Sequence, residues 1–231
     1  MRKHTSPKKK RLAIALVVIL ALSVAAIVYA TEFSNTAVKV SVGVHVGDTF
    51  TYKLTGISVL GSLDAKTPAY LSDYNNTEYY QIKIIAVNGS TVSFITLWKF
   101  NNGTEVTMPQ ILDIGNGNKT DGNGFWAIYP ANLKASDLLR PTGYDKLRVN
   151  GTDTQRYAAS SRQRNFWQIE NQFFDSNDPT GNTQRDDYVG VYFDQQTGMA
   201  TALTNIQRFN QPQYNIILTY QLISSNVWSV R

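Results

Sequence analysis

Apolar side chains recur at every second position through most of this chain. The alternation runs through residues 38–46, 50–54, 80–86, 92–100 and 214–222. A period of two places successive side chains on opposite faces of a β-strand, whereas an amphipathic helix needs a period of about 3.6. The pattern therefore predicts a mainly β fold.

Residues that favour tight turns separate these segments. Asn88-Gly89 and Asn101-Asn102-Gly103 stand between consecutive strand patterns, and residues 194–198 end in a glycine. Asparagine and glycine adopt the positive φ that hairpin turns require. Consecutive strands joined by short turns predict an antiparallel meander, with further strands over residues 152–158, 164–174, 188–193 and 199–206.

Residues 132–140, bracketed by Pro130 and Pro141, predict one short helix. No linker rich in proline and glycine interrupts residues 38–231, so we expect one domain there. The two architectures that fit the strand pattern are an antiparallel β-sandwich and a strongly curved sheet.

A continuous apolar stretch precedes this domain. Residues 12–30 contain no charge, proline or glycine, and as a helix they span roughly 28 Å, close to the hydrocarbon core of a bilayer. The basic segment 1–11 predicts a cytoplasmic N-terminus by the positive-inside rule. We therefore expect a single-pass membrane protein. Residues 12–30 contact the lipid bilayer, residues 31–37 form a short tether, and residues 38–231 lie outside the cell.

Two other fates of this stretch also export the domain. Cleavage by signal peptidase after Ala30 releases a secreted protein. Cleavage near Arg11, as in a pilin, leaves the apolar helix as a filament core, although Leu12 is not the small residue usual there. The length of the stretch favours the retained anchor, because a signal peptide usually has only about 7–15 apolar residues.

The charge is divided unevenly between tail and domain. Residues 1–30 carry six basic residues and no acidic one, whereas the remainder has 16 basic and 17 acidic side chains. The net charge of +5 therefore reflects the tail. Because a nucleic-acid-binding domain needs a basic face, we exclude nucleic acid as a partner.

Residues that support catalysis or metal binding are few. The chain has no cysteine and two histidines, His4 and His45. The polar loops at residues 116–124, 175–178 and 186–187 lack the ligand spacing of a calcium site. No nucleophile stands in a recognisable motif with a base. We expect no enzymatic activity, no cofactor and no metal.

Five Asn-X-Ser/Thr sequons for N-glycosylation fall in expected turns or loops of the exported domain. Their acceptor residues are Asn75, Asn88, Asn102, Asn118 and Asn150. We predict these five asparagines as candidate glycosylation sites.

Several phrases of the chain resemble those of uncharacterised archaeal surface proteins that are membrane-anchored or secreted. These phrases are VHVGDTFTYKLTG (44–56), TEYYQIKIIAVNGSTVSF (77–94), KFNNGTE (99–105), YPANLKASDLL (129–139), YFDQQTGMA (192–200) and SSNVW (224–228). The resemblance covers most of residues 44–228. It implies an N-terminal signal or anchor followed by an exported β-rich domain, and it implies no activity or functional residues.

These features together predict a cell-envelope surface protein whose domain is a structural or interaction module. Its expected partners are other envelope proteins or further copies of the chain. One alternative is a carrier of lipid or sugar, in which aromatic residues such as Tyr129 and Trp167 line an apolar groove. Another alternative is a filament subunit that donates residues 38–46 as a strand to its neighbour.

Overall fold

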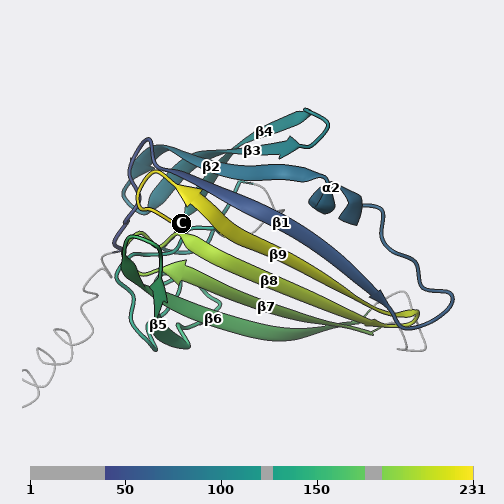
Figure 1. Cartoon of the computed structure of the whole chain (residues 1–231). Helices are drawn as coiled ribbons and strands as arrows, with labels where there is room; N and C mark the ends of the chain where they lie inside the picture. The colour runs from purple at the N-terminus through teal and green to yellow at the C-terminus, as the bar shows by residue number, and fades with distance from the viewer. Residues whose placement is uncertain (1–39, 121–126, 175–183, 231) are drawn as a thin grey trace, which may run out of the picture. The chain divides into compact units, whose positions relative to one another are not determined.

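One nine-stranded sheet dominates the computed structural model, which describes residues 40–120, 127–174 and 184–230 (Figure 1). These residues belong to one unit, Val40–Arg231. The strands are β1 (Thr49–Leu60), β2 (Thr77–Asn88), β3 (Thr91–Phe100), β4 (Glu105–Asp113), β5 (Gly151–Arg156), β6 (Ser161–Phe174), β7 (Gln184–Asp194), β8 (Ala200–Asn210) and β9 (Gln213–Ser225). A short helix, α2 (Leu71–Asn75), lies between β1 and β2.

The strand order is β4-β3-β2-β1-β9-β8-β7-β6-β5, and all neighbouring strands are antiparallel. Two meanders, β1 to β4 and β5 to β9, are joined where β1 pairs with β9. This ladder runs from Phe50 opposite Ser225 to Leu60 opposite Tyr214. The predicted antiparallel β fold is confirmed, and its strands form one curved sheet (Figure 1).

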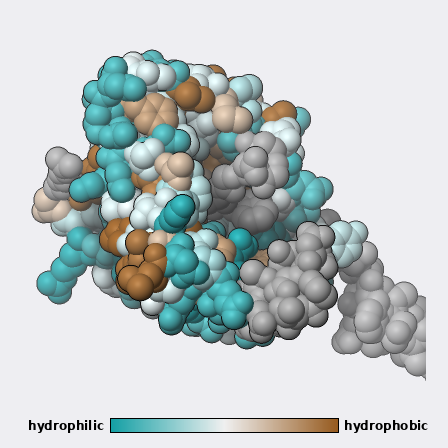
Figure 2. All heavy atoms as spheres, turned by 90° about the vertical axis from the view of Figure 1, so that its right-hand side faces the viewer, coloured by the Kyte–Doolittle hydropathy of each residue, from teal (hydrophilic) through white to brown (hydrophobic). Residues whose placement is uncertain are grey.

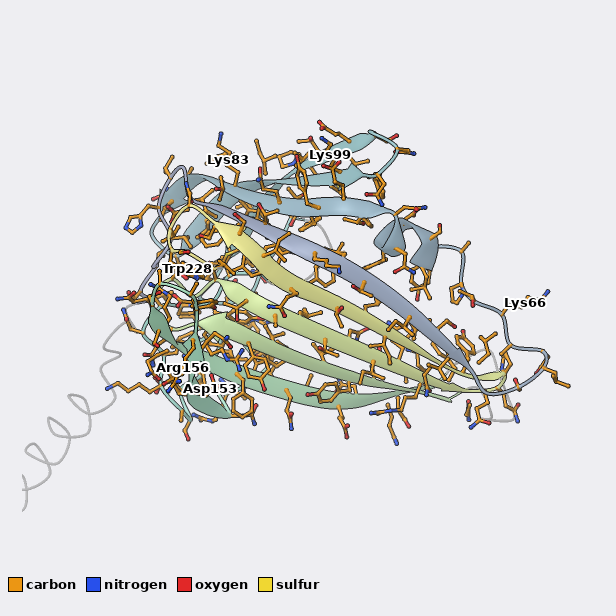
Figure 3. The ribbon with its side chains drawn as sticks, viewed as in Figure 1. Lys66, Lys83, Lys99, Asp153, Arg156 and Trp228 are labelled. Atoms are coloured by element: carbon orange, nitrogen blue, oxygen red, sulfur yellow. The ribbon has the colours of Figure 1, made fainter. Side chains whose placement is uncertain are left out.

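Alternate side chains of the strands point into one interior, and we call this side of the sheet the inner face. Phe50, Tyr52 and Leu54 of β1 are buried there, and Phe50 lies opposite Ile82 of β2. Figure 3 shows Lys83 pointing away from this interior, as the two-residue period requires. The apolar half of the alternation therefore forms the core.

The turn between β2 and β3 lies one residue later than predicted. Asn88 pairs with Thr91 at the end of the ladder, so Gly89 and Ser90 form the two-residue loop. Of these turn residues, Gly89 alone has a positive φ, of 58°. A positive φ at the first central residue alone indicates a type II′ turn, not the type I′ turn that an Asn-Gly centre predicts.

The predicted helix over residues 132–140 is wrong. The segment is irregular, with positive φ at Asn132 and Ser136. Its backbone amides donate to distant carbonyls, from Asn132 to Gln195 (2.7 Å) and from Ser136 to Val149 (2.8 Å). These tertiary hydrogen bonds replace the bonds that a helix would make within itself.

The predicted strand over residues 38–46 is also wrong in its described part. Residues 40–46 are irregular, yet Val44 is buried and Val40 and Val42 pack against the same core cluster. The carbonyl of Ser41 accepts a hydrogen bond from the amide of Ala131 (2.7 Å). The alternation in this segment reflects burial of one side of an irregular chain, without strand pairing.

The connection from β4 to β5 leads from one edge of the sheet to the other, and its residues 127–150 pack on the inner face. We call residues 127–150 the inner segment. The amide of Tyr129 donates to the carbonyl of Gly198 (2.9 Å). The carbonyl of Leu133 accepts hydrogen bonds from the side-chain amides of Asn165 and Gln195, both at 2.8 Å. Buried polar groups thus fix the inner segment on β6 and on the β7–β8 turn.

Within the described part of the chain, no helix has the length and apolarity needed to cross a membrane. The predicted span, residues 12–30, lies outside the described residues, as do the basic segment 1–11, the tether 31–37 and the acidic loop 175–178. The membrane anchor stays a prediction from the sequence.

Candidate ligand-binding cleft

A cleft of about 520 Å³ lies on the inner face between the inner segment and α2. Its volume falls within the range of about 300–1,000 Å³ that is typical of small-molecule sites. Six aliphatic side chains contribute to its lining, five of them from β6 to β9: Leu147, Ile169, Val189, Val191, Leu203 and Leu218. The cleft is therefore mainly an apolar surface.

The register of the sheet explains this apolar floor. Ile169 lies opposite Val189, and Val191 lies opposite Trp167, so the alternate residues of β6 and β7 share the inner face. Leu203 of β8 in turn lies opposite Tyr220 of β9. Four strands from one meander thus bring together side chains that are up to 53 positions apart in the sequence, from Trp167 to Tyr220.

Three amide side chains stand beside the apolar floor, where the inner face continues along β6 and β8. They are Asn171, Asn205 and Gln207. Asn171 is exposed, and the amide of Asn205 donates to the carbonyl of Tyr188 (3.2 Å). Because these amides lie at the boundary with solvent, they mark the polar mouth of the cleft.

The opposite end of the cleft is aromatic. Tyr129 of the inner segment stacks on Phe193 with ring centroids 4.5 Å apart and meets Trp167 of β6 edge-on at 6.2 Å. Tyr129 is 2% exposed and Trp167 is 5% exposed. The hydroxyl of Tyr129 and the indole Nε1 of Trp167 are both buried without a hydrogen bond of normal geometry. Such unpartnered groups are uncommon in protein interiors.

A charged pair lines the wall beside Tyr129. The guanidinium of Arg140 contacts the carboxylate of Asp145, and both residues belong to the inner segment. Burial lowers the pKa of Arg140 and raises the pKa of Tyr129. The neighbouring indole N–H of Trp167, followed by the charge of Arg140, opposes this rise in the pKa of Tyr129. Arg140 therefore lies close enough to Tyr129 to influence its hydroxyl.

Tyr74 of α2 and Tyr220 of β9 form the facing wall. Their hydroxyls lie 3.0 Å apart, and their rings meet edge-on at 6.0 Å. Burial, followed by the neighbouring Tyr74, raises the pKa of Tyr220, so the Tyr220 hydroxyl stays neutral at physiological pH. The wall presents aromatic rings and hydroxyl groups to a ligand.

No protein-family model matches the chain, and no curated protein matches it at a significant level. The resemblance to archaeal surface proteins therefore stays a prediction, and the function has to be argued from the cleft.

The residues that the structure describes offer weaker candidates for other kinds of functional site. They contain no group of three or more His, Asp or Glu side chains arranged to hold a metal ion. The side chain of His45 is 82% exposed, with its nearest acidic partner, Asp48, at 3.8 Å. A second hollow of about 460 Å³, at the β8–β9 hairpin, has mostly polar walls that include Asp186 and Arg208.

None of the five predicted glycosylation sites lines the cleft. Asn88 is exposed at the end of β2, Asn102 is exposed in the β3–β4 turn, and Asn118 and Asn150 are exposed in loops. Asn75 differs, because its side-chain amide exchanges two hydrogen bonds with the backbone of Gly56, at 2.8 and 3.1 Å. That asparagine ties the end of α2 to β1.

Sequence reasoning named Tyr129 and Trp167 as candidate groove residues, and the structure places both at one end of the cleft. It did not identify Arg140 or the amides Asn171, Asn205 and Gln207. The two-residue period of β6 and β8 places these three amides on the inner face, and this period is the sequence signal that could have identified them as cleft residues. Nothing in the sequence shows that side chains of the inner segment leave this region uncovered.

Proposed function

We propose that the exported domain is a binding module that holds an elongated apolar molecule on the inner face of its sheet. The observation that carries this proposal is the cleft between the inner segment and α2. A purely structural domain is expected to fill its interior with side chains. Here the apolar floor is left open beside a few convergent polar groups, which is the usual composition of a ligand site.

In this proposal the module works at the cell envelope. Residues 12–30 anchor it in the lipid bilayer with the N-terminus in the cytoplasm, and the domain faces outward. A bilayer is a reservoir of apolar molecules, so the setting suits the cleft. Glycans on Asn88, Asn102, Asn118 and Asn150 would leave it accessible, because none of these residues lines it.

The other functions predicted from the sequence find less support in the described residues. A filament that assembles by strand donation needs a free strand, and residues 40–44 instead pack into their own domain through Val40, Val42 and Val44. It also needs an open acceptor edge. On the edge strand β4, the amide of Ile111 donates to Thr120 (3.1 Å), and Pro109, which faces the same side, has no amide hydrogen to donate.

Photolabelling of the full chain in its own membranes tests the binding module. The probe is a twelve-carbon hydrocarbon that carries a diazirine and a terminal alkyne and no oxygen. We expect it to label peptides of β6 to β9 in the wild type. Val189→Phe, which places a ring over the apolar floor, is expected to reduce this labelling at least about tenfold, in line with the steric limits of a packed site.

The matched control is Val59→Phe, which adds the same ring to a side chain that is 51% exposed near the end of β1. Figure 2 views this end of the molecule, where apolar patches stand between hydrophilic side chains. Labelling of the cleft is expected to be unchanged in this variant. The proposal would be overturned if Val189→Phe left the labelling of β6–β9 peptides unchanged, or if the probe labelled only exposed apolar patches.

A further inference from the structure

The aromatic end of the cleft contains two hydrogen-bonding groups, the Tyr129 hydroxyl and the Trp167 indole N–H, that lie close enough to interact but form no hydrogen bond of normal geometry. The Trp167 indole is a donor only, and the Tyr129 hydroxyl both donates and accepts. Each sits in a residue at least nine-tenths buried, and both residues line the same cleft. A buried unpartnered donor is costly to a protein, so its presence in a ligand cleft points to a partner supplied by the ligand.

We infer that the ligand is a single hydrocarbon chain of medium length that ends in a carbonyl oxygen, as in a carboxylic acid or its ester, and that Tyr129 and Trp167 bind this oxygen. The inference rests on the proposed binding module and adds the class and the orientation of its ligand.

The geometry supports an oxygen acceptor at this position. A carbonyl oxygen has two lone pairs, so one atom satisfies both the Trp167 Nε1–H and the Tyr129 hydroxyl. Tyr129 belongs to the inner segment and Trp167 to β6, so a small separation of these two elements admits the oxygen between them. Arg140, whose charge influences Tyr129, adds a positive group beside the same point.

The sheet sets the length and direction of the chain. The cleft extends along β6 from Trp167 past Ile169 to Asn171, and the four residue-to-residue steps between these ends of the strand segment span roughly 13 Å. The hydrocarbon then lies on the aliphatic floor and points toward the exposed amides at the mouth. This distance fits an extended chain of about ten carbon atoms.

The test compares two photoprobes on the full chain in membranes: the hydrocarbon probe described above and a dodecanoic acid with the same diazirine and alkyne. For each probe we measure the concentration that gives half-maximal labelling of β6–β9 peptides. Tyr129→Phe keeps the ring and removes one donor, and Trp167→Phe replaces the indole by a smaller aromatic ring and removes the other donor. We expect each to raise the half-maximal concentration of the acid about tenfold and to leave that of the hydrocarbon unchanged.

Trp228→Phe is the matched control. Its indole nitrogen is also buried without a hydrogen bond of normal geometry, and it interacts with Tyr157 as Trp167 does with Tyr129. The residue lies near the C-terminus outside the cleft, where Arg162 stacks on its ring at 4.5 Å. Figure 3 marks its position. This variant is expected to leave labelling by both probes unchanged.

The outcomes separate the two proposals. Absence of cleft labelling by either probe would overturn the binding module itself. A second outcome is that both probes label the cleft and that neither Trp167→Phe nor Tyr129→Phe changes the half-maximal labelling concentration of the acid probe. This outcome would overturn the assigned ligand class and leave the binding module standing. An equal loss in Trp228→Phe would show that the effect is not located at the cleft and would also overturn the assignment.

Discussion

Two buried tyrosines, Tyr52 and Tyr129, show at the scale of single residues how this protein uses polar groups in its core. The hydroxyl of Tyr52 donates to the carbonyl of Ala200 at 2.7 Å, whereas the hydroxyl of Tyr129 forms no hydrogen bond of normal geometry. Tyr52→Phe is expected to lower the free energy of unfolding by about 1 kcal/mol, because it leaves a buried carbonyl without a donor. Tyr129→Phe is expected to leave that free energy unchanged or to raise it slightly.

Urea denaturation of the two variants and the wild type, followed by tryptophan fluorescence, checks the comparison. Both substitutions remove one hydroxyl from a fully buried ring, so the difference between them isolates the hydrogen bond. A loss for Tyr129→Phe as large as that for Tyr52→Phe would show that the Tyr129 hydroxyl stabilises the fold. A gain would mean that the protein retains this hydroxyl at a cost in stability, as expected of a binding group.

At the scale of the element, the turn between β7 and β8 depends on a buried ion pair. The side chain of Asp194 is 2% exposed and accepts two hydrogen bonds from Arg162, at 2.6 and 2.9 Å. It also accepts a hydrogen bond from the backbone amide of Thr197 at 2.8 Å. Asp194→Ala is expected to cost about 3 kcal/mol or more, because it leaves the largely buried guanidinium of Arg162 without its anion.

Asp153→Ala is the matched control for this prediction. Asp153 accepts the same bidentate pair of hydrogen bonds from Arg164, at 2.6 and 2.9 Å, but its side chain is 45% exposed. Water compensates for the loss of an exposed pair, so we expect a change below about 1 kcal/mol. Thermal unfolding of both variants measures the two losses of stability. Equal shifts in the melting midpoint would contradict the claim that burial makes the Asp194 pair more important for stability than the Asp153 pair.

The strands were the most predictable elements. Phe50, Tyr52 and Leu54 alternate with polar residues, and this local period is sufficient to define β1 and its inner face. The helix at residues 132–140 was mispredicted because Asn132 and Ser136 find hydrogen-bond partners at Gln195 and Val149, far along the chain. Residues 40–46 alternate for the same reason that a strand does, burial of one side, but pair with no strand.

The cleft was less predictable than the sheet. Tyr129 and Trp167 are large aromatic residues, which are candidates for either core or groove. What decides between these roles is the path of the inner segment, since it covers Phe193 and leaves Val189 uncovered. That path depends on contacts such as those of Leu133 with Asn165 and Gln195, which no local sequence pattern reveals.

At the scale of the whole molecule, the arrangement of the sheet explains why a cleft forms in one half. The core on β1 to β4 is closed by bulky side chains such as Phe94 and Trp228. On β6 to β9 the inner segment and α2 each cover one part of the inner face, and the floor between them stays open. The uncovered part of the inner face therefore lies in the β5–β9 meander.

The membrane anchor is the last prediction, and it concerns the whole chain. Residues 12–30 are long enough to span a bilayer, and no proline, glycine or charge interrupts them. Ile27, Val28 and Tyr29 continue the apolar run almost to Ala30, and a tyrosine suits the outer membrane interface. We therefore expect the protein to stay with the membrane fraction after a high-salt wash, because salt weakens charge contacts and leaves a buried helix in place.

Fractionation of cells followed by N-terminal analysis of the mature protein checks this prediction. A retained anchor gives a membrane-bound chain that still contains residues 12–30. A protein that begins at Thr31 and is released into the medium would contradict it. The binding module would then act as a secreted carrier, and its cleft would have to load at a membrane that does not hold it. Retention instead keeps the cleft within reach of the bilayer through the tether 31–37, so that the ligand has only a short distance to travel in water.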